Sequence, residues 1–402
     1  MNILSKLWAR TFQISMRAML PVLPYRNPKI IKDIRDVPHL IKEKGKRRAL
    51  IVADPVIIEL KLAMPMLAAF AECGISYSLY DKVVPNPTTK ECEEARAMYI
   101  NDGCDCLVAI GGGSSLDCAK AVGARIARPK KQLSKMEGIL KIRKKIPLLI
   151  AIPTTAGTGS ETTLAAVICD AETRHKYAID DFPLIPSYAV LDGSILRTLP
   201  PKVISATGID ALTHALEAYL GRSTTKDTRR DSLNVIKLIF ENLQKAYSTR
   251  SEESLDNMLH ASHYAGRAFS KSYVGYVHAL AHALGGKYNT PHGLANAVLL
   301  SPVLKAYGSA IHKKLKKICI FCGFADQSTS PEQAAAIFFE KLDGLERAIG
   351  IPLTLPEIKE DDLDLLVNYA YKEAYPLYPV PVLWDKDKLK SMYREVMTDE
   401  QR

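Results

Sequence analysis

The 402-residue sequence lacks any uninterrupted apolar run of about 18 residues, the length that a helix needs to span a bilayer. It also lacks internal repeats and low-complexity segments, so we do not expect a repeat array. Hydrophobic residues make up 47% of the chain and charged residues 24%, a balance that is normal for a soluble globular enzyme. The length is too great for one ordinary core and indicates about two domains.

Cysteine is sparse: eight residues are spread over the chain, and no secretory signal is evident. We therefore expect free thiols in a reducing compartment, and a cytoplasmic protein. Two close pairs, Cys104/Cys106 and Cys319/Cys322, invite a metal or redox interpretation. Both pairs lie in or beside apolar runs, which favours small buried hydrophobes instead.

Acidic residues are absent from the first 32 positions, and the first acid is Asp33. Residues 1–50 contain twelve Lys and Arg and three acids, a net charge of +9, whereas the whole chain carries +10. A nucleic-acid enzyme would more often have its basic patch beside its active site. The charge therefore belongs to an N-terminal arm, and we expect no nucleic-acid partner.

The arm, residues 1–24, has an amphipathic helical pattern. Apolar side chains recur at helical spacing and cationic ones fall largely on the other side: Leu4, Leu7, Trp8, Phe12, Met16, Met19 and Leu20 against Lys6, Arg10 and Arg17. Arg17 and the missing small-residue cleavage site argue against a secretory signal. Three interpretations stay open. The first is a helix docked on the body or on a second subunit; the others are a membrane-surface anchor, favoured by Trp8, and a cleaved transit peptide, weakened by the scarcity of Ser.

Short apolar runs alternate with helical stretches between residues 48 and 192. The runs predict strands at 49–53, 76–80, 106–110, 148–152 and 189–191, and the stretches between them predict helices near 56–73, 89–103 and 116–127. Short apolar strands separated by helices are typical of a parallel sheet that is covered on both faces.

Strand signals fade after Leu199-Pro200-Pro201, a pair of prolines that is a natural domain boundary. Helices are predicted at 208–220, 230–247, 252–269, 273–285, 294–306, 310–321, 331–349 and 386–397. The predicted organisation is an amphipathic basic arm (1–27), an α/β dinucleotide-binding domain (28–200) and an all-α metal- and substrate-binding domain (201–402). Because domain interfaces are preferred ligand sites, we expect the ligands between the two domains.

Two glycine-rich loops follow predicted strands. Gly111 to Ser115 (GGGSS) opens a helix, where glycine backbone and the helix N-terminus suit a diphosphate. A plain tight turn is the alternative, and the G-x-G-x-x-G fingerprint is absent. Pro153 to Glu161 (PTTAGTGSE) offers hydroxyl groups for phosphates, ribose or nicotinamide. Loops after parallel strands of one sheet meet at its carboxyl edge, where ligands bind, so their coincidence favours a nucleotide site.

Asp54 ends the first clear strand. A carboxylate there accepts hydrogen bonds from adenosine ribose hydroxyls and repels a 2′-phosphate, which favours NAD over NADP. The alternative is an N-cap of the following helix, a role that Asp also fills well. The sequence alone barely distinguishes a ribose-binding role of Asp54 from an N-cap role.

A group of candidate metal ligands lies in the helical half. Asp210 and His214 are four residues apart, so they share a helix face, and the same holds for His278 and His282. His292 follows in Thr290-Pro291-His292-Gly293. A carboxylate with imidazoles suits divalent iron or zinc. A lone His on an apolar helix is usually a packed core residue, but paired spacings make that explanation less attractive here. His260 and His263, three apart, are ranked as surface or packing residues.

These motifs resemble the iron-containing (group III) alcohol dehydrogenase family, whose members include lactaldehyde reductases and 1,3-propanediol dehydrogenases. The resemblance runs from about residue 28 to about 370 and is carried by GGGSSLDCAK (111–120), IPTTAGTGSE (152–161), GIDALTHALEAY (208–219) and GYVHALAHALGGKYNTPHGLAN (275–296). It implies a two-domain architecture like that of dehydroquinate synthase. It also implies an NAD-dependent enzyme that transfers hydride between a small alcohol and nicotinamide, with Fe²⁺ as the metal, or Zn²⁺.

The resemblance assigns roles to individual residues. The implied metal ligands are Asp210, His214, His278 and His292, with His282 beside the metal without binding it and Phe269 lining the substrate pocket. Because His282 lies one helical turn from a ligand, we expect it to carry the proton. The positions that match the cofactor side are Asp54, Asn86, Gly112, Gly113, Ser114, Asp117, Thr154, Thr155 and Lys176. We expect a homodimer that acts on a small alcohol or aldehyde.

Two segments depart from the family pattern. The cationic arm stands where many members begin with a strand. Glu373 to Trp384 (EAYPLYPVPVLW) replaces the usual Gly-Asn-Pro-Arg ending, and because that region borders the pocket in relatives, the resemblance does not identify the substrate. One rival function is a zinc-dependent synthase or lyase of the dehydroquinate synthase type. It would need Arg and Lys near the metal, whereas the motifs have apolar and small neighbours. Another is a metal-binding or membrane-associated structural protein, which would leave both glycine loops without a purpose.

Overall fold

The computed structural model describes residues 1–173 and 175–401, which form two compact units. Residues 24–198 form the α/β unit. Residues 1–23 and the chain from residue 199 onward form the helical unit, so the N-terminal arm belongs with the helices.

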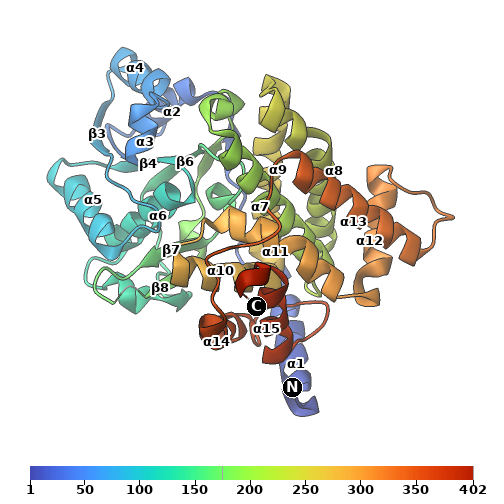
Figure 1. Ribbon diagram of the computed structural model, residues 1–402. Helices are drawn as coiled ribbons and strands as arrows, with labels where there is room; N and C mark the ends of the chain where they lie inside the picture. Colours follow the sequence, from blue (N-terminus) through green and yellow to red (C-terminus); the bar gives the residue numbers. More distant parts are fainter. Residues whose placement is uncertain (174, 402) are drawn as a thin grey trace. The chain divides into compact units, whose positions relative to one another are not determined.

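The α/β unit is built on a six-stranded, fully parallel sheet in the order β1-β9-β6-β4-β2-β3 (Figure 1). Its strands are β1 (Lys29–Ile31), β2 (Arg48–Ala53), β3 (Ser76–Tyr80), β4 (Cys106–Gly111), β6 (Leu148–Pro153) and β9 (Tyr188–Val190). Alternate residues of the central strands enter two separate cores, for example Leu50 and Val52 on one face and Ile51 and Ala53 on the other. The sheet is therefore buried on both faces, as the near-continuous apolar runs predict.

Helices cover both faces of this sheet. The core that contains Leu50 is completed by α5 (Thr89–Asn101) and α6 (Gly113–Ala127), and the core that contains Ile51 by α2 (Val37–Glu43), α3 (Pro55–Glu59) and α4 (Met64–Cys73). The single helix predicted near 56–73 is wrong, because the chain breaks at Lys61, which has a φ of 58°, and Pro65 then starts a new helix.

A second, three-stranded sheet was not predicted. It consists of β5 (Gly138–Ile139), β7 (Ala165–Cys169) and β8 (Lys176–Asp180), in the order β5-β8-β7, with β7 and β8 antiparallel. These strands are short and only half-buried, so their sequences lack the continuous apolar runs of the main sheet.

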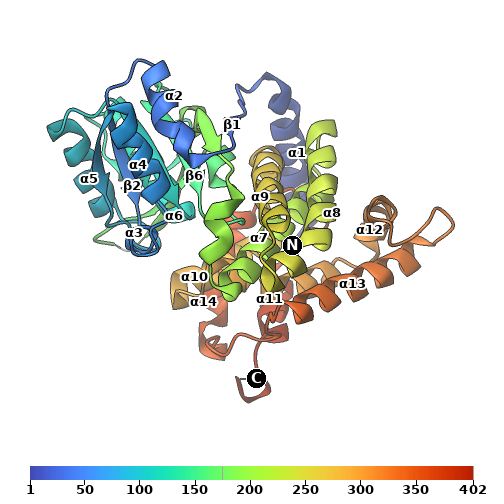
Figure 2. The ribbon, with the colours of Figure 1, turned by 90° about the horizontal axis from the view of Figure 1, so that it is seen from above.

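The helical unit contains α1 and α7 to α15. These helices are α1 (Ile3–Met19), α7 (Pro201–Leu220), α8 (Lys226–Ser248), α9 (Glu252–Ser272), α10 (Tyr276–Tyr288), α11 (His292–Ala306), α12 (Ser309–Cys322), α13 (Pro331–Ala348), α14 (Leu363–Ala374) and α15 (Lys386–Glu395). Helices α7, α8 and α9 pack side by side (Figures 1 and 2). The sequence analysis missed α14. Among the described residues, no single helix is long and apolar enough to cross a membrane; α11 and α12 qualify only as a pair, bent by 114°.

All eight cysteines are free. Cys104, Cys106 and Cys319 are buried and Cys322 is partly buried, which agrees with a packing role.

Helix α1 docks on its own unit through a mixed face, in which Ala9 is buried and Phe12 and Met16 are partly buried beside the polar side chain of Gln13. Gln13 is 4% exposed and bonds to backbone carbonyls of the segment after α14, whereas Leu4, Leu7 and Trp8 are 77%, 63% and 58% exposed. Carbonyl groups that leave water need donors, which Gln13 supplies and leucine cannot. The docking interpretation thus holds for one face of α1, whereas the apolar residues Leu4, Leu7 and Trp8 near its start stay exposed.

Candidate metal centre and cofactor loops

Helix α7 carries two candidate ligands on its buried face. Asp210 and His214 stand one turn apart and are 1% and 4% exposed. Gly208 lets α7 pack closely against α8, because a Cβ there would lie 2.3 Å from a side-chain carbon of Leu243. The carboxylate and the imidazole are therefore held on a tightly packed helix.

Helices α10 and α11 bring two further histidines to this point. His278 lies in the first turn of α10, and His292 is the first residue of α11. The Nε2 atoms of His278 and His292 lie 3.6 Å and 3.3 Å from Oδ1 of Asp210. One donor atom from each of Asp210, His214, His278 and His292 lies within 4.8 Å of the others. Donors so placed fit around one ion with bonds of ~2.1 Å. Within residues 1–173 and 175–401, no other group of His, Cys, Asp or Glu has this arrangement.

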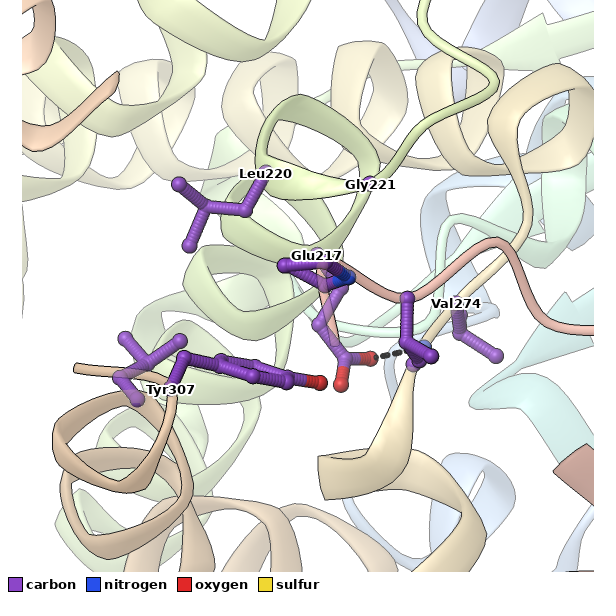
Figure 3. A pocket seen from close by; sticks show the side chains of 9 residues that line it. Glu217, Leu220, Gly221, Val274 and Tyr307 are labelled. Carbon is purple, nitrogen blue, oxygen red and sulfur yellow. Dashed lines mark hydrogen bonds between the residues drawn. The ribbon is translucent and has the colours of Figure 1, made fainter. Parts of the chain in front are cut away.

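Glu217, also on α7, orients His278. Its carboxylate accepts hydrogen bonds from the backbone N–H of Gly275 (2.7 Å, drawn in Figure 3) and of Val277 (2.8 Å). His278 Nδ1 lies 2.6 Å from the same carboxylate. Gly275 permits this approach, since a Cβ there would lie 2.7 Å from Glu217 Oε1. Because His278 donates through Nδ1, its Nε2 faces Asp210 and is the nitrogen that a metal would bind in place of a proton.

Asn296 fixes the other side of the centre. It lies one turn after His292 on α11 and is fully buried. Its Nδ2 donates to Asp210 Oδ1 at 2.7 Å and lies 3.1 Å from His292 Nε2. Asn296 therefore holds the Asp210 carboxylate at the point where the histidine nitrogens converge.

The electrostatics suit a cation. Burial lowers the pKa of His214 and of His292, which keeps both imidazoles neutral. Burial also acts on His278, but the Glu217 and Asp210 carboxylates outweigh it and raise its pKa to about 9. For Asp210, burial opposes ionisation, yet the surrounding histidines hold its pKa well below the usual value. The two buried carboxylates thus favour positive charge where the imidazoles meet.

The residues present fit a divalent metal. His278 Nε2 and His214 Nδ1 are buried, and neither has a hydrogen-bond partner in the described part of the chain. A buried polar atom left without a partner costs about 1–3 kcal/mol, so such atoms call for an explanation. One oxygen donor and three nitrogen donors suit iron or zinc.

Two other predicted residues lie against the four-residue group. The ring of Phe269 stacks on His214, with ring centres 4.1 Å apart and 12° between planes. The His282 ring stacks on His292 at 5.1 Å. His282 stands outside the four donors, and its Nδ1 bonds Glu373 at 2.6 Å.

The two glycine-rich loops meet at the carboxyl edge of the main sheet. Gly111 has a φ of 148°, and a Cβ there would lie 2.4 Å from Ser115 Oγ, so only glycine fits. Gly112 caps α6, which begins at Gly113 and Ser114. The Thr154 N–H donates to Gly111 O at 3.0 Å, and Thr155 follows in the second loop.

Asp54 stands at the same edge and caps α3, since it accepts a hydrogen bond from Ile57 N at 3.3 Å. It also accepts a bond from Ser115 Oγ at 3.2 Å, which ties it to the first glycine loop. Asp54 therefore acts as an N-cap, and its contact with a ribose stays a prediction.

The remaining cofactor-side candidates join these loops. Lys176 Nζ donates to Asn86 Oδ1 at 2.7 Å, and Asn86 N–H donates to Ser114 Oγ at 3.3 Å. Asp117 accepts bonds from Ser160 Oγ (2.7 Å) and from Val167 N–H (3.0 Å), so it ties α6 to the second loop and to β7.

The sequence analysis missed Glu217, Asn296 and Glu373. Glu217 lies three residues after His214, and Asn296 lies four after His292, so helical spacing from a ligand was a usable signal for both. Glu373 lies 91 residues from His282, and no local spacing connects them.

The α/β unit has its glycine loops at the carboxyl edge of a parallel sheet, which is the arrangement of dinucleotide-binding enzymes. The helical unit holds an Asp-and-His group, buried at three of its four residues, that suits one divalent metal. Together they define a metal-dependent, nucleotide-linked class of enzyme.

Comparison with known proteins gives the family. The family model for iron-containing alcohol dehydrogenase matches residues 31–193, and the model for the C-terminal part of the Fe-containing alcohol dehydrogenase family matches residues 204–397. Alcohol dehydrogenase 4 of Schizosaccharomyces pombe is 37% identical over 367 residues, which cover 89% of this chain and 84% of the relative. The chain belongs to the iron-containing alcohol dehydrogenase family.

Solved structures share the fold. A crystal structure of 1,3-propanediol oxidoreductase matches with a TM-score of 0.88 and 31% identity, over 92% of this chain and 99% of the other. Sulfoacetaldehyde reductase from Bifidobacterium kashiwanohense, in complex with NAD⁺, matches with a TM-score of 0.81 and 25% identity, over 92% and 98%. The chain is therefore a metal-dependent, NAD-linked alcohol dehydrogenase or aldehyde reductase, and the synthase or lyase alternative is not favoured.

Proposed function

We propose that the enzyme interconverts a small alcohol and its aldehyde or ketone at a metal centre made of Asp210, His214, His278 and His292. The observation that carries this proposal is the convergence of four donor atoms within 4.8 Å, three of them from buried residues, with His278 Nε2 turned toward Asp210. Family membership favours Fe²⁺, and the same donor set also suits Zn²⁺.

The protein's own residues divide the remaining work. When bound, the divalent metal would supply positive charge to stabilise the substrate oxygen, and NAD would supply the hydride-transfer chemistry. Glu217 keeps His278 in the tautomer with a free Nε2. Phe269, stacked on His214, offers an apolar wall to the substrate. Because Glu373 holds Nδ1 of His282, Nε2 is the atom of that ring which can accept a proton from the alcohol.

NAD is proposed to lie along the carboxyl edge of the main sheet. Gly112, Gly113 and Ser114 present the backbone N–H groups at the start of α6 to its diphosphate. Thr154 and Thr155 supply hydroxyl groups beside that loop, and Asp54 faces the adenosine ribose. The cluster of Asn86, Asp117 and Lys176 supports the same edge.

Cofactor choice tests this placement. Absorbance at 340 nm is followed with NAD or NADP and a panel of ethanol, 1,2-propanediol and 1,3-propanediol. We expect NAD to be preferred, because Asp54 repels a 2′-phosphate. Asp54→Gly should lower the ratio of kcat/KM with NAD to kcat/KM with NADP about tenfold. Glycine is a tolerated N-cap that costs only a few tenths of a kcal/mol, so α3 should survive. Asp33→Gly, which removes another N-cap from the same unit, should leave the preference unchanged. A wild-type enzyme that prefers NADP would overturn the proposal.

The outward face of α1 is proposed to bind an anionic membrane surface. Its exposed apolar residues Leu4, Leu7 and Trp8 share the helix with exposed Lys6 and Arg17, and residues 1–24 carry three Lys and Arg residues and no acid. An exposed apolar helix face with cationic flanks is typical of helices that lie in the membrane interface.

Co-sedimentation with vesicles measures this binding. Wild type should bind phosphatidylserine vesicles more than phosphatidylcholine vesicles, and less at high salt because salt screens the charges. A Leu7→Ser/Trp8→Ser variant should lose most of the binding. Leu353→Ser, an equally polar change at a residue that is 81% exposed elsewhere, should bind like wild type. Equal binding by the α1 variant and wild type would exclude this role for the helix.

We further propose that the enzyme is a cytoplasmic homodimer. Eight free thiols fit a reducing compartment. Light scattering coupled to size-exclusion chromatography should give the mass of two chains, and the mass of one chain would refute the dimer.

A further inference from the structure

Behind His282 lies a hydrogen-bonded chain of side chains that leads to the surface helix α1. Its first link is Glu373, on α14, whose Oε1 lies 2.6 Å from His282 Nδ1. The second link is Tyr378, whose hydroxyl donates to the same Oε1 at 2.6 Å. For Glu373, burial opposes ionisation, yet His282 outweighs it and holds its pKa below the usual value. Two donors on one carboxylate oxygen fix the His282 ring with its Nδ1 proton toward Glu373.

The segment that follows Glu373 and carries Tyr378 is held by side chains from outside it. Residues 375–381 contain three prolines, which lack N–H groups and cannot form regular secondary structure there. Their carbonyl groups take donors from elsewhere in the unit instead, and Arg222 N–H donates to Pro379 O at 2.7 Å. Val380 and Pro381 of this segment also line the small pocket beside Glu217 (Figure 3).

Helix α1 supplies most of the remaining donors. Gln13 Nε2 donates to Pro376 O at 2.9 Å and to Tyr378 O at 2.8 Å. Arg10 donates to Val380 O at 2.8 Å and to Pro381 O at 3.0 Å, and it also bonds the Gln13 side chain at 2.8 Å. In return, the Tyr375 hydroxyl donates to Ser5 O at 3.1 Å. The backbone on both sides of Tyr378 is thus tied to a helix some 370 residues away in the sequence.

We propose that Glu373 and Tyr378 position His282 for proton transfer, and that α1 holds Tyr378 in place through Gln13 and Arg10. This inference rests on the proposed role of His282. The side of the N-terminal helix that carries Gln13 and Arg10 then sets the geometry behind His282, whereas Leu4, Leu7 and Trp8 stay exposed.

A double-mutant cycle tests whether these residues act through His282. On the full-length, iron-loaded enzyme, Glu373→Ala should lower kcat about 10- to 100-fold, Tyr378→Phe about tenfold, and Gln13→Ala about threefold or more. KM and bound iron should stay near the wild-type values. In a His282→Ala background, the same three substitutions should change kcat by less than about twofold, because the group that they position is absent.

Thr11→Ala, at an exposed position of α1, is the matched control for Gln13→Ala and should leave kcat unchanged. If Glu373→Ala does not fold, Tyr378→Phe keeps the test decisive, because it removes only a hydroxyl group. Losses of equal size in the wild-type and His282→Ala backgrounds would overturn the positioning role, since they would show a merely structural effect. Unchanged kcat in all three single variants would overturn it as well. Failure of the proposed function looks different: His282→Ala itself would then keep the wild-type kcat.

Discussion

Replacing His278 or His292 with Ala is expected to remove bound iron and activity together. Each residue supplies one of four donor atoms that lie within 4.8 Å of one another, and the three donors that remain after its loss should hold an ion far more weakly. Loss of the Lewis acid removes several kcal/mol of charge stabilisation, so turnover should fall on the order of 10³-fold or more. Elemental analysis of purified protein, paired with the rate at 340 nm, measures both losses.

His263→Ala is the matched control. His263 is buried in α9 of the same helical unit, but it is not one of the four donors. Its removal should leave the iron content intact, so iron loss in the His278 variant cannot be ascribed to a missing buried imidazole alone. A His278→Ala or His292→Ala protein that keeps full iron would show that the ligand set is wrong.

His282→Ala is expected to keep iron but lose about 10²-fold in kcat. The side chain stacks on His292 and bonds Glu373, yet it stands outside the four donors. A fifth protein ligand would crowd the position that a catalytic metal leaves open for substrate. His282 is also 37% exposed, so its truncation opens no sealed cavity.

Bound iron compared with kcat separates the two roles of His282. Loss of iron in step with activity would make it a ligand and leave the proton without a carrier. Retention of both iron and the wild-type kcat would remove it from the mechanism.

The main sheet was predictable because each central strand is a short apolar run between helical stretches. The strands predicted at 49–53 and 106–110 are found as Arg48–Ala53 and Cys106–Gly111. The errors in the predicted secondary structure were confined to short segments. Lys61 with positive φ splits one predicted helix, and β7 and β8 are half-buried strands without a continuous apolar pattern. Hydrophobic periodicity in a sequence reflects which side chains are buried, so the pattern is weak where a helix or strand is only partly buried.

Helical spacing alone brought together Asp210 with His214 and His278 with His282, but it could not say which of the histidines is not a donor. That distinction depends on how α7, α10 and α11 cross, which is a tertiary property. Glu373 illustrates the same limit, because its contact with His282 spans 91 residues.

The contacts of the N-terminal arm were harder to predict than those of the metal centre. The arm's amphipathic pattern left docking, a membrane surface and a transit peptide open, and it did not indicate that Gln13 and Arg10 bond to the body of the unit. The reason is the proline-rich segment opposite, whose carbonyls require donors.

The most direct test of the account is an iron titration. The enzyme is stripped with a chelator and reloaded anaerobically with Fe²⁺, and bound iron is measured alongside NADH formation with a small alcohol. We predict that turnover rises in proportion to bound iron and levels off at one ion per chain, and that His278→Ala neither binds the ion nor recovers. Full turnover by the stripped enzyme, or recovery of the His278→Ala protein, would contradict a metal centre formed by Asp210, His214, His278 and His292.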